Sequence, residues 1–164
     1  MLPDTTLEQA RALLELLRER GMTIATAESC TGGLIAAALT AIPGSSDSVV
    51  GGFVTYSNQA KVSMLGVPPG VLAGVGAVSE AVARRMAESA AGRGGADIGV
   101  SCTGIAGPGG ATETKPVGLV FIGAARRGGT ALVERHVLPG DRAAVRAATV
   151  AAALSLVEAM LREG

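Results

Sequence analysis

The chain has 164 residues, 48% of them hydrophobic and 17% charged, which suits one globular domain, residues 1–164, with a sizeable core. Fourteen basic residues balance fourteen acidic ones, and with two Phe, one Tyr and no Trp there are few stacking platforms, so nucleic acid is not an expected partner. The longest apolar runs fall short of the ~18 residues that a membrane span needs, and the N-terminus lacks a signal-peptide pattern, so a cytoplasmic protein that does not bind membranes is expected.

The first predicted elements are a helix, a strand and a second helix. Thr5 and Glu8 have the spacing of a capping box, and apolar residues then recur at helical spacing until Gly21. The run Met22 to Thr26 follows as a buried strand. The next helix extends from Leu34 to Ile42 and ends before a Pro-Gly pair.

Between that strand and that helix lies the sequence Ala-Glu-Ser-Cys-Thr-Gly-Gly, residues 27–33, which indicates a strand-to-helix elbow. The unpaired N–H groups of a helix start, here of Thr31, Gly32 and Gly33, attract negative charge, and Ser29 would stand at that mouth. Adjacent glycines also let a ligand or another backbone approach closely. A small-residue turn capped by Thr31 fits the same residues equally well.

The middle of the chain continues the alternation of strands and helices. Ser48 to Tyr56 has the composition of a strand, and Ser57-Asn58 offers a cap for a short helix from Gln59 to about Leu65. Lys61 would lie in its first turn. The proline- and glycine-containing stretch from Gly66 to Val78 is interpreted as a connecting loop.

The remaining elements complete the fold prediction. Ser79 caps a helix with the apolar stripe Val82, Met86 and Ala90, which ends at Gly92 to Gly95. Three strands and a closing helix follow: Ile98 to Cys102, Val117 to Ala125, Thr130 to Leu138 as the second arm of a hairpin, and the helix from the cap Asp141 to about Leu161. This order predicts a three-layer α/β/α domain around a mixed five-stranded sheet, with ligands beyond the carboxyl ends of the strands.

The sequence Ser-Cys-Thr-Gly occurs twice, at residues 29–32 and 101–104, each time after a strand. Only the first copy leads into a helix, so Ser29 is the better nucleophile candidate and the second copy is expected to line the site. Chance repetition of small residues explains the pair about as well. Cys30 and Cys102 are alternative nucleophiles, although cysteines beside apolar strands usually serve packing.

A nucleophilic serine needs a base. The one histidine, His136, lies in the last predicted strand, where a structural role is commoner, and this disfavours a Ser-His-Asp triad. A lysine can serve if its pKa is depressed, and Lys61 and Lys115 are the two lysines of the chain. Lys61 is the better placed, although a solvated surface lysine remains the alternative. With two cysteines and one histidine, no Cys/His metal cluster is expected.

These residues belong to a wider pattern of six segments. In chain order they are residues 26–33 (TAESCTGG), 51–58 (GGFVTYSN) with Lys61, 76–80 (GAVSE), 104–108 (GIAGP), 115–118 (KPVG) and 140–142 (GDR). The pattern resembles the C-terminal domain family of the competence/damage-inducible protein CinA, that is, nicotinamide-nucleotide amidohydrolase. The segments cover nearly the full chain in the family's order.

The resemblance implies hydrolysis of the carboxamide of nicotinamide mononucleotide, to nicotinic acid mononucleotide and ammonia, with no metal or other cofactor. It implies Ser29 as nucleophile, Lys61 as its general base and Tyr56 as a partner that orients or relays the proton, through an acyl-enzyme. It further implies a substrate-binding set: Glu28, Cys30, Thr31, Gly32, Gly33, Thr103, Gly104, Gly107 and Arg142.

One departure from the family is visible, because Gly109 follows Pro108 where an acidic residue is common. This puts in doubt a polar ribose contact from that loop. The phosphate is expected near the elbow or the glycine-rich loop, with Arg142 or Lys115 as charge partners. The Ala/Val-rich closing helix could bury a face in a homo-oligomer, and the preceding pyrophosphatase domain of longer relatives is not expected within 164 residues. A nucleotide-binding regulatory module, or an amidase for a related pyridine amide, are the alternatives.

Overall fold

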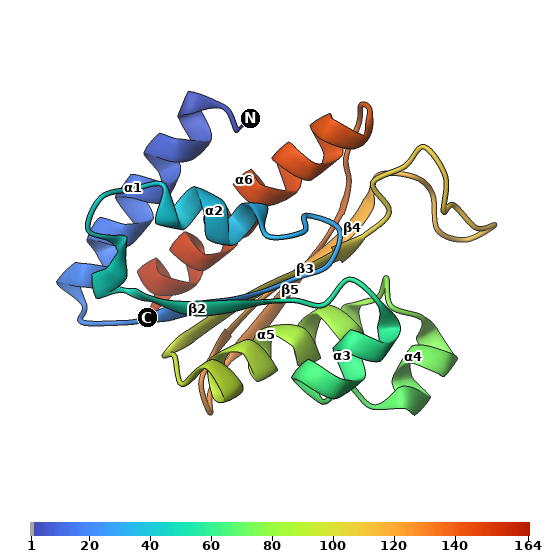
Figure 1. Ribbon diagram of the computed structural model, residues 1–164, viewed down its shortest axis with the longest axis horizontal. Helices are drawn as coiled ribbons and strands as arrows, with labels where there is room; N and C mark the ends of the chain where they lie inside the picture. Colours follow the sequence, from blue (N-terminus) through green and yellow to red (C-terminus); the bar gives the residue numbers. More distant parts are fainter. Residues whose placement is uncertain (1) are drawn as a thin grey trace.

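A mixed five-stranded sheet lies between two layers of helices in the computed structural model, which describes residues 2–164 (Figure 1). The strand order is β2-β1-β3-β4-β5, with β2, β1 and β3 parallel and β4 antiparallel to both of its neighbours. The strands are β1 (Ile24–Glu28), β2 (Val49–Val54), β3 (Ile98–Gly104), β4 (Leu119–Arg126) and β5 (Ala131–Val137). The predicted fold class is confirmed.

The helices divide between the two faces of the sheet. They are α1 (Asp4–Glu19), α2 (Leu34–Thr40), α3 (Asn58–Leu65), α4 (Pro69–Val75), α5 (Glu80–Gly94) and α6 (Arg142–Glu163), with a 3-10 turn at Ser45–Asp47. In Figure 1, α1, α2 and α6 cover one face, and α3, α4 and α5 cover the other. The connection from β3 to β4 projects from the body of the molecule beyond the sheet edge where the elbow after β1 also lies.

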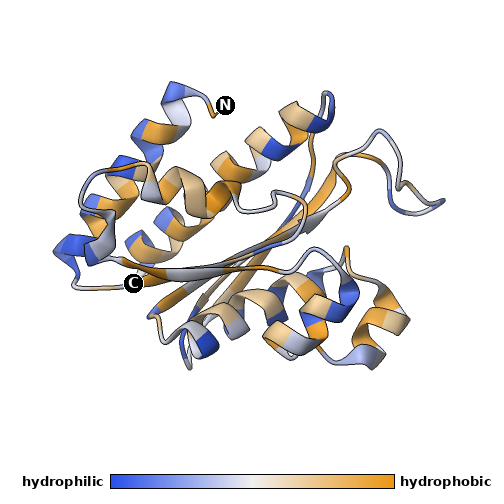
Figure 2. Ribbon diagram, in the orientation of Figure 1, coloured by the Kyte–Doolittle hydropathy of each residue, from blue (hydrophilic) through white to orange (hydrophobic). Residues whose placement is uncertain are grey.

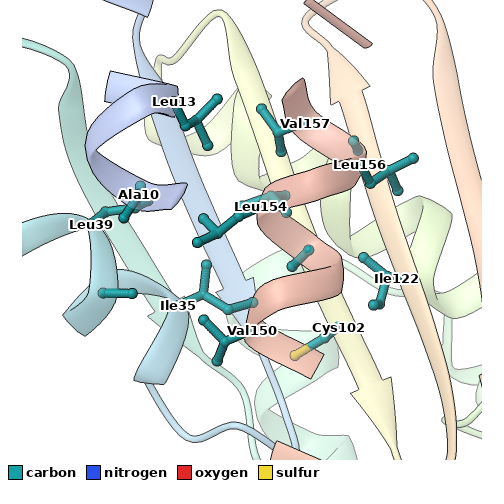
Figure 3. Close-up of a cluster of buried hydrophobic side chains, with 14 of the residues drawn as sticks. Ala10, Leu13, Ile35, Leu39, Cys102, Ile122, Val150, Leu154, Leu156 and Val157 are labelled. Atoms are coloured by element: carbon teal, nitrogen blue, oxygen red, sulfur yellow. The ribbon is translucent and has the colours of Figure 1, made fainter. Parts of the chain in front are cut away.

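The larger core lies under α1, α2 and α6. In Figure 3, Leu154 of α6 points into the space between Leu13 of α1 and Ile35 of α2, and all three are fully buried. By length and apolar composition alone α6 would also suffice to cross a membrane, but half of that stretch is buried here as a core helix. A smaller core contains Met86 of α5 together with Ala25 and Ala27 of β1. Figure 2 shows hydrophobic residues, in orange, along strands of the sheet between the two helix layers.

Several predicted helix starts are confirmed by their hydrogen bonds. The Ser79 hydroxyl accepts from the Val82 N–H, and the Asp141 carboxylate accepts from the Ala144 N–H. Of the pair proposed to cap α3, Ser57 is the cap, because its hydroxyl accepts from the Ala60 N–H. These caps satisfy N–H groups that have no partner within a helix.

Several predictions of element bounds are wrong. The Thr5–Glu8 capping box does not form, because α1 begins at Asp4 and the Pro3 carbonyl accepts from the N–H groups at the helix start. The stretch predicted as a loop contains α4, which begins at Pro69. The first strand lies two residues later than predicted, so that it ends with Glu28.

Candidate active site

Ser29 and Lys61 meet at the carboxyl end of β1. Ser29 follows the strand directly, and Lys61 lies in the first turn of α3, whose start is set by the Ser57 cap. The Lys61 Nζ lies 2.9 Å from the Ser29 Oγ. The lysine is 1% exposed and the serine 9%, so the pair is shielded from bulk water. The surface-lysine alternative is therefore excluded by the structure.

Two backbone carbonyls hold the amine of Lys61. Its Nζ donates to the Thr55 carbonyl at 2.7 Å and to the Tyr56 carbonyl at 3.4 Å. Burial lowers the pKa of Lys61 below its ordinary value, because an ammonium ion loses hydration inside the protein. A neutral amine has two N–H donors and one lone pair, which match two carbonyls and one serine hydroxyl. The surroundings thus suit a lysine that receives a proton from Ser29.

A cleft of about 230 Å³ opens over this pair. Ala106 and Arg142 line this cleft and also a larger neighbouring cavity of about 710 Å³ at the start of α6. The cleft residues are Ser29, Cys30, Tyr56, Asn58, Lys61, Ala77, Val78, Thr103, Gly104, Ala106 and Arg142. Polar side chains make up about half of this lining, and among them Lys61 contacts Ser29.

The hydroxyl of Tyr56, expected to orient or relay the proton, does not contact Lys61. Its side chain is 62% exposed, and its hydroxyl accepts from Arg142 Nη2 at 2.9 Å, while Arg142 Nη1 donates to the Gly107 carbonyl at 2.9 Å. The contact between Tyr56 and Lys61 is through the tyrosine carbonyl. In this geometry the phenol lies with Arg142 at the rim of the cleft, and the main chain of Tyr56 orients the lysine.

Glu28 and Thr31 turn into the protein, and for them the expected contact with substrate is corrected. The Glu28 carboxylate is fully buried and accepts from the N–H groups of Ile35 and Ala36 at 2.8 and 3.0 Å, and from the Thr31 hydroxyl. Strand residues alternate between faces, so Glu28 points to the side opposite Ser29. The start of α2, expected to attract a substrate anion, is already satisfied by this internal carboxylate.

The two Ser-Cys-Thr-Gly copies have different surroundings. Ser101 is fully buried and donates to the Ala83 carbonyl at 2.6 Å, so it faces α5. Cys102 lies in the core beneath α6 (Figure 3). Of the second copy, Thr103 and Gly104 line the cleft, and the Thr103 hydroxyl donates to the Ala77 carbonyl.

Cys30 lies on the cleft wall but is poorly suited to nucleophilic attack. The neighbouring Cys102 thiol and burial raise the pKa of the Cys30 thiol, so its reactive thiolate is disfavoured. The thiol is 6% exposed and belongs to the core cluster. Of the candidate nucleophiles, Ser29 is the one in contact with a lysine amine.

The expected glycines shape the backbone around the site. Gly32 and Gly33 have φ of 59° and 109°, conformations that residues with a Cβ rarely adopt. The Gly32 N–H donates to the Ser29 carbonyl, which closes the turn. Cys30 lines the cleft beside Ser29, whereas Thr31 has no exposed surface. At Gly107 a Cβ would lie 2.5 Å from the Val117 side chain, so a side chain does not fit there.

Sequence reasoning missed several residues at the site. Asn58, Ala77, Val78 and Ala106 line the cleft. Arg146 lies one turn after Arg142 on α6 and contacts the elbow itself. The sequence does contain a signal for these residues. Arg142 and Arg146 follow the Asp141 cap four residues apart, a spacing that places two positive charges on one face at the start of the helix. Among residues 2–164 there is no group of three or more side chains suited to a metal ion.

The chain is similar to proteins of one family over nearly its full length. The model of the CinA C-terminal domain matches residues 6–161. A CinA-like protein of Chlorobaculum tepidum is 54% identical over 143 residues, which cover 85% of this chain and 33% of that protein. A CinA-like protein of Mycobacterium sp. (strain JLS) is 49% identical, covering 96% of this chain and 36% of the relative. The chain thus spans about a third of the length of the curated relatives it matches.

Solved structures agree with these sequence relatives. The competence/damage inducible protein CihA from Agrobacterium tumefaciens has a TM-score of 0.94 at 45% identity, covering 99% of this chain and 98% of its own. A competence-damaged protein (CinA) superfamily protein from Klebsiella pneumoniae has a TM-score of 0.93 at 36% identity, covering 97% and 99%. The chain therefore belongs to the CinA C-terminal domain family.

Proposed function

We propose that this chain hydrolyses the carboxamide of nicotinamide mononucleotide to nicotinic acid mononucleotide and ammonia. The activity comes from the resemblance of its motifs to nicotinamide-nucleotide amidohydrolase. The observation that carries it is the contact of 2.9 Å between the buried Lys61 amine and the Ser29 hydroxyl. A binding module has no need of a buried lysine against a serine, because burying the amine costs stability.

In the first half of the reaction, neutral Lys61 takes the proton of the Ser29 hydroxyl as Oγ bonds to the carboxamide carbon. Negative charge develops on the carboxamide oxygen, and hydrogen-bond donors at the cleft would stabilise it. The Lys61 ammonium then returns the proton to the leaving nitrogen. The C–N bond breaks, ammonia departs, and the nicotinoyl group stays on Ser29 as an ester.

In the second half, water replaces ammonia. Lys61 takes a proton from the water as its oxygen bonds to the ester carbon. The proton passes to Ser29 Oγ when the ester C–O bond breaks, and the product is a carboxylic acid, which gives its proton to water or to the released ammonia and becomes a carboxylate. One lysine thus serves both halves.

The two cavities divide the nucleotide between them. The cleft of about 230 Å³ over Ser29 suits a group of the size of the pyridine carboxamide. The ribose and phosphate would extend past Arg142 into the neighbouring cavity of about 710 Å³. Arg142 is the cation at the junction, and a guanidinium is well suited to a phosphate. With the α2 start satisfied by Glu28, this cavity is the better phosphate site.

Ammonia release separates this proposal from its alternatives. Nicotinamide mononucleotide, nicotinamide riboside and free nicotinamide are tested side by side with the wild-type chain. We expect the mononucleotide to have the highest kcat/KM. Faster release from the riboside or free nicotinamide would assign the chain to another pyridine amide. Binding of the mononucleotide without release of ammonia from any of the three would identify a regulatory module.

A further inference from the structure

Asn58 lies at the start of α3, three residues before Lys61. Residues with this spacing share one face of a helix, and both of these residues line the cleft over Ser29. The Ser57 hydroxyl caps α3 by accepting from the Ala60 N–H, so the cap does not use Asn58. Asn58 is exposed, and its side chain has no hydrogen bond to the part of the chain that the structure describes. Its amide is therefore open to a ligand in the cleft.

The other side chains of the cleft that carry nitrogen or oxygen are already bonded. The Lys61 amine donates to Ser29 and to two backbone carbonyls. The Thr103 hydroxyl donates to a backbone carbonyl at 2.9 Å, and the Tyr56 hydroxyl accepts from the arginine at the rim at 2.9 Å. Within the described residues, Asn58 is the side chain of this lining whose donors and acceptor are all unused.

The unused groups of Asn58 match those of a carboxamide. An asparagine side chain ends in an NH₂ group, which donates, and a carbonyl oxygen, which accepts. A substrate carboxamide has the same two groups, so the two amides can form a pair of hydrogen bonds that run in opposite directions. A carboxylate has acceptors and no donor, so it cannot bond to the asparagine carbonyl. Asn58 is thus suited to distinguish an amide from an acid.

We propose that Asn58 recognises the reacting carboxamide and distinguishes the substrate from its carboxylate product. The inference rests on the proposed amide hydrolysis at Ser29. Asn58 Nδ2 donates to the carboxamide oxygen, and Asn58 Oδ1 accepts from the carboxamide NH₂. The first bond strengthens as that oxygen gains negative charge during attack by Ser29. In the product an oxygen replaces the NH₂ group and lies against Asn58 Oδ1, so two acceptors meet and binding weakens.

Binding to the inactive Ser29→Ala protein tests this recognition, because the amide is not consumed. Calorimetry compares nicotinamide mononucleotide with nicotinic acid mononucleotide, which differ only in the group that Asn58 would contact. Adding Asn58→Ala should raise the Kd for the amide about 10- to 100-fold, because two hydrogen bonds are lost, and should not raise the Kd for the acid. An unchanged ratio of the two Kd values would overturn the proposal.

Gln59 provides the matched control. It follows Asn58 in α3, is exposed and does not line the cleft. In the same Ser29→Ala protein, Gln59→Ala removes a side-chain amide from the same turn of the helix and should leave both Kd values within about twofold. Asn58→Ala should fold, because alanine is favoured in a helix and the Ser57 cap remains. An equal effect of the two alanine variants on the Kd for the amide would also overturn the proposal.

Turnover gives a second measurement with Ser29 intact. Asn58→Asp keeps the size and one acceptor of the side chain but lacks the NH₂ donor, and a carboxylate is favoured at a helix start. We expect its kcat/KM for ammonia release to fall at least about tenfold, because the donor to the developing negative charge is lost. Gln59→Glu adds the same charge one residue further along and should stay within about threefold of wild type. Wild-type kcat/KM in Asn58→Asp would contradict the proposed contact.

Failure of the proposed function gives a different result. If wild-type protein releases ammonia but Asn58→Ala leaves the ratio of Kd values unchanged, the hydrolysis stands and the role of Asn58 is wrong. If wild-type protein releases no ammonia but Asn58→Ala selectively weakens binding of the amide, the hydrolysis is wrong and Asn58 recognises the carboxamide in a binding module. Binding of neither mononucleotide would overturn both.

Discussion

Lys61 is among the largest fully buried side chains of the protein, and its amine would be costly to bury as an ammonium ion. Among residues 2–164, no carboxylate lies within hydrogen-bonding distance of its amine to stabilise a charge. The oxygens within hydrogen-bonding distance are two backbone carbonyls and the Ser29 hydroxyl. Such a site stabilises the neutral amine relative to the ammonium, as proton transfer from a serine requires.

The first prediction concerns Ser29. Ser29→Ala should abolish ammonia release and leave nucleotide binding and Tm nearly unchanged, because a small hydroxyl at the edge of the core contributes little to packing. Ser101→Ala is the matched control, since Ser101 donates to the Ala83 carbonyl away from the cleft. It should retain activity and lose about 1 kcal/mol of stability. If Ser101→Ala lost activity while Ser29→Ala kept it, Ser101 and not Ser29 would be the nucleophile.

The second prediction concerns stability and pH. Burial lowers the pKa of Lys61 from the ordinary value of 10.5, so between the lowered pKa and 10.5 the unfolded chain binds more protons than the folded chain. The free energy of unfolding should therefore rise with pH across this window. Urea denaturation of wild type and Lys61→Met at several pH values measures the difference. The free energy of unfolding of wild type should rise with pH more than that of the variant. If the free energies of unfolding of both proteins changed with pH in parallel, the pKa of Lys61 would not be lowered.

At the scale of elements, hydrogen bonds hold the elbow that follows Ser29 from two helices. Glu28 bonds the start of α2 from within the protein, and Arg146 bonds the elbow carbonyls from α6. α3 brings Lys61 from the other face of the sheet. The proposed nucleophile and its proposed base therefore lie on different elements, and the distance between them depends on the packing of α3 beside the end of β1.

The third prediction tests the role of Glu28 in holding α2. Glu28→Gln exchanges a carboxylate oxygen for an amide NH₂ that cannot accept from the buried N–H groups of Ile35 and Ala36. We expect a loss of about 1–3 kcal/mol in the free energy of unfolding, measured by urea denaturation. Glu15→Gln, on the exposed face of α1, is the control and should change stability by less than ~0.5 kcal/mol. Equal stability of both variants would refute the capping role.

The order of elements could be predicted from the sequence because apolar runs and caps mark them locally. The cap Asp141 and the stripe of Met86 are examples, and both are confirmed. α4 could not be predicted, because Gly70 and Gly74 lower its helix propensity and its stability comes from Leu72 in the smaller core.

The site could be predicted in part. Ser29 and Lys61 were identified as candidates from residue types and from the resemblance, but their contact depends on tertiary packing that no local pattern encodes. The resemblance implied that Glu28 binds substrate, but its side chain is buried against the start of α2. Strand alternation places neighbouring side chains on opposite faces, and that argument becomes available once β1 is known to reach Glu28.

At the scale of the whole molecule, the cleft is formed by parts of the chain that lie far apart in sequence. Residues after β1, β2 and β3 line it together with Arg142 at the start of α6. The parallel strands β1 and β3 end at the same edge of the sheet, which brings their following loops together. Arg142 lines both the small cleft and the larger cavity, so it lies where the two cavities meet.

The fourth prediction follows from this division. The mononucleotide should exceed the riboside in kcat/KM, because the phosphate gains the Arg142 guanidinium in the larger cavity. Arg142→Met should reduce that preference by raising KM for the mononucleotide about tenfold or more, since a charge-assisted hydrogen bond contributes ~1.5–3 kcal/mol. Steady-state kinetics on both substrates measure it. An unchanged preference in the variant would place the phosphate elsewhere.

The central claim is that neutral Lys61 is the base for Ser29, and kcat for ammonia release by Lys61→Arg tests it most directly. Arginine keeps a positive charge but does not deprotonate in proteins, so it cannot accept the serine proton. With nucleotide binding verified separately, the variant should have less than about a tenth of the wild-type kcat at every pH, because positioned acid–base groups contribute ~10²- to 10⁴-fold. Wild-type kcat should fall on the acid side as Lys61 becomes protonated. An arginine variant with more than about a tenth of the wild-type kcat would contradict the assignment.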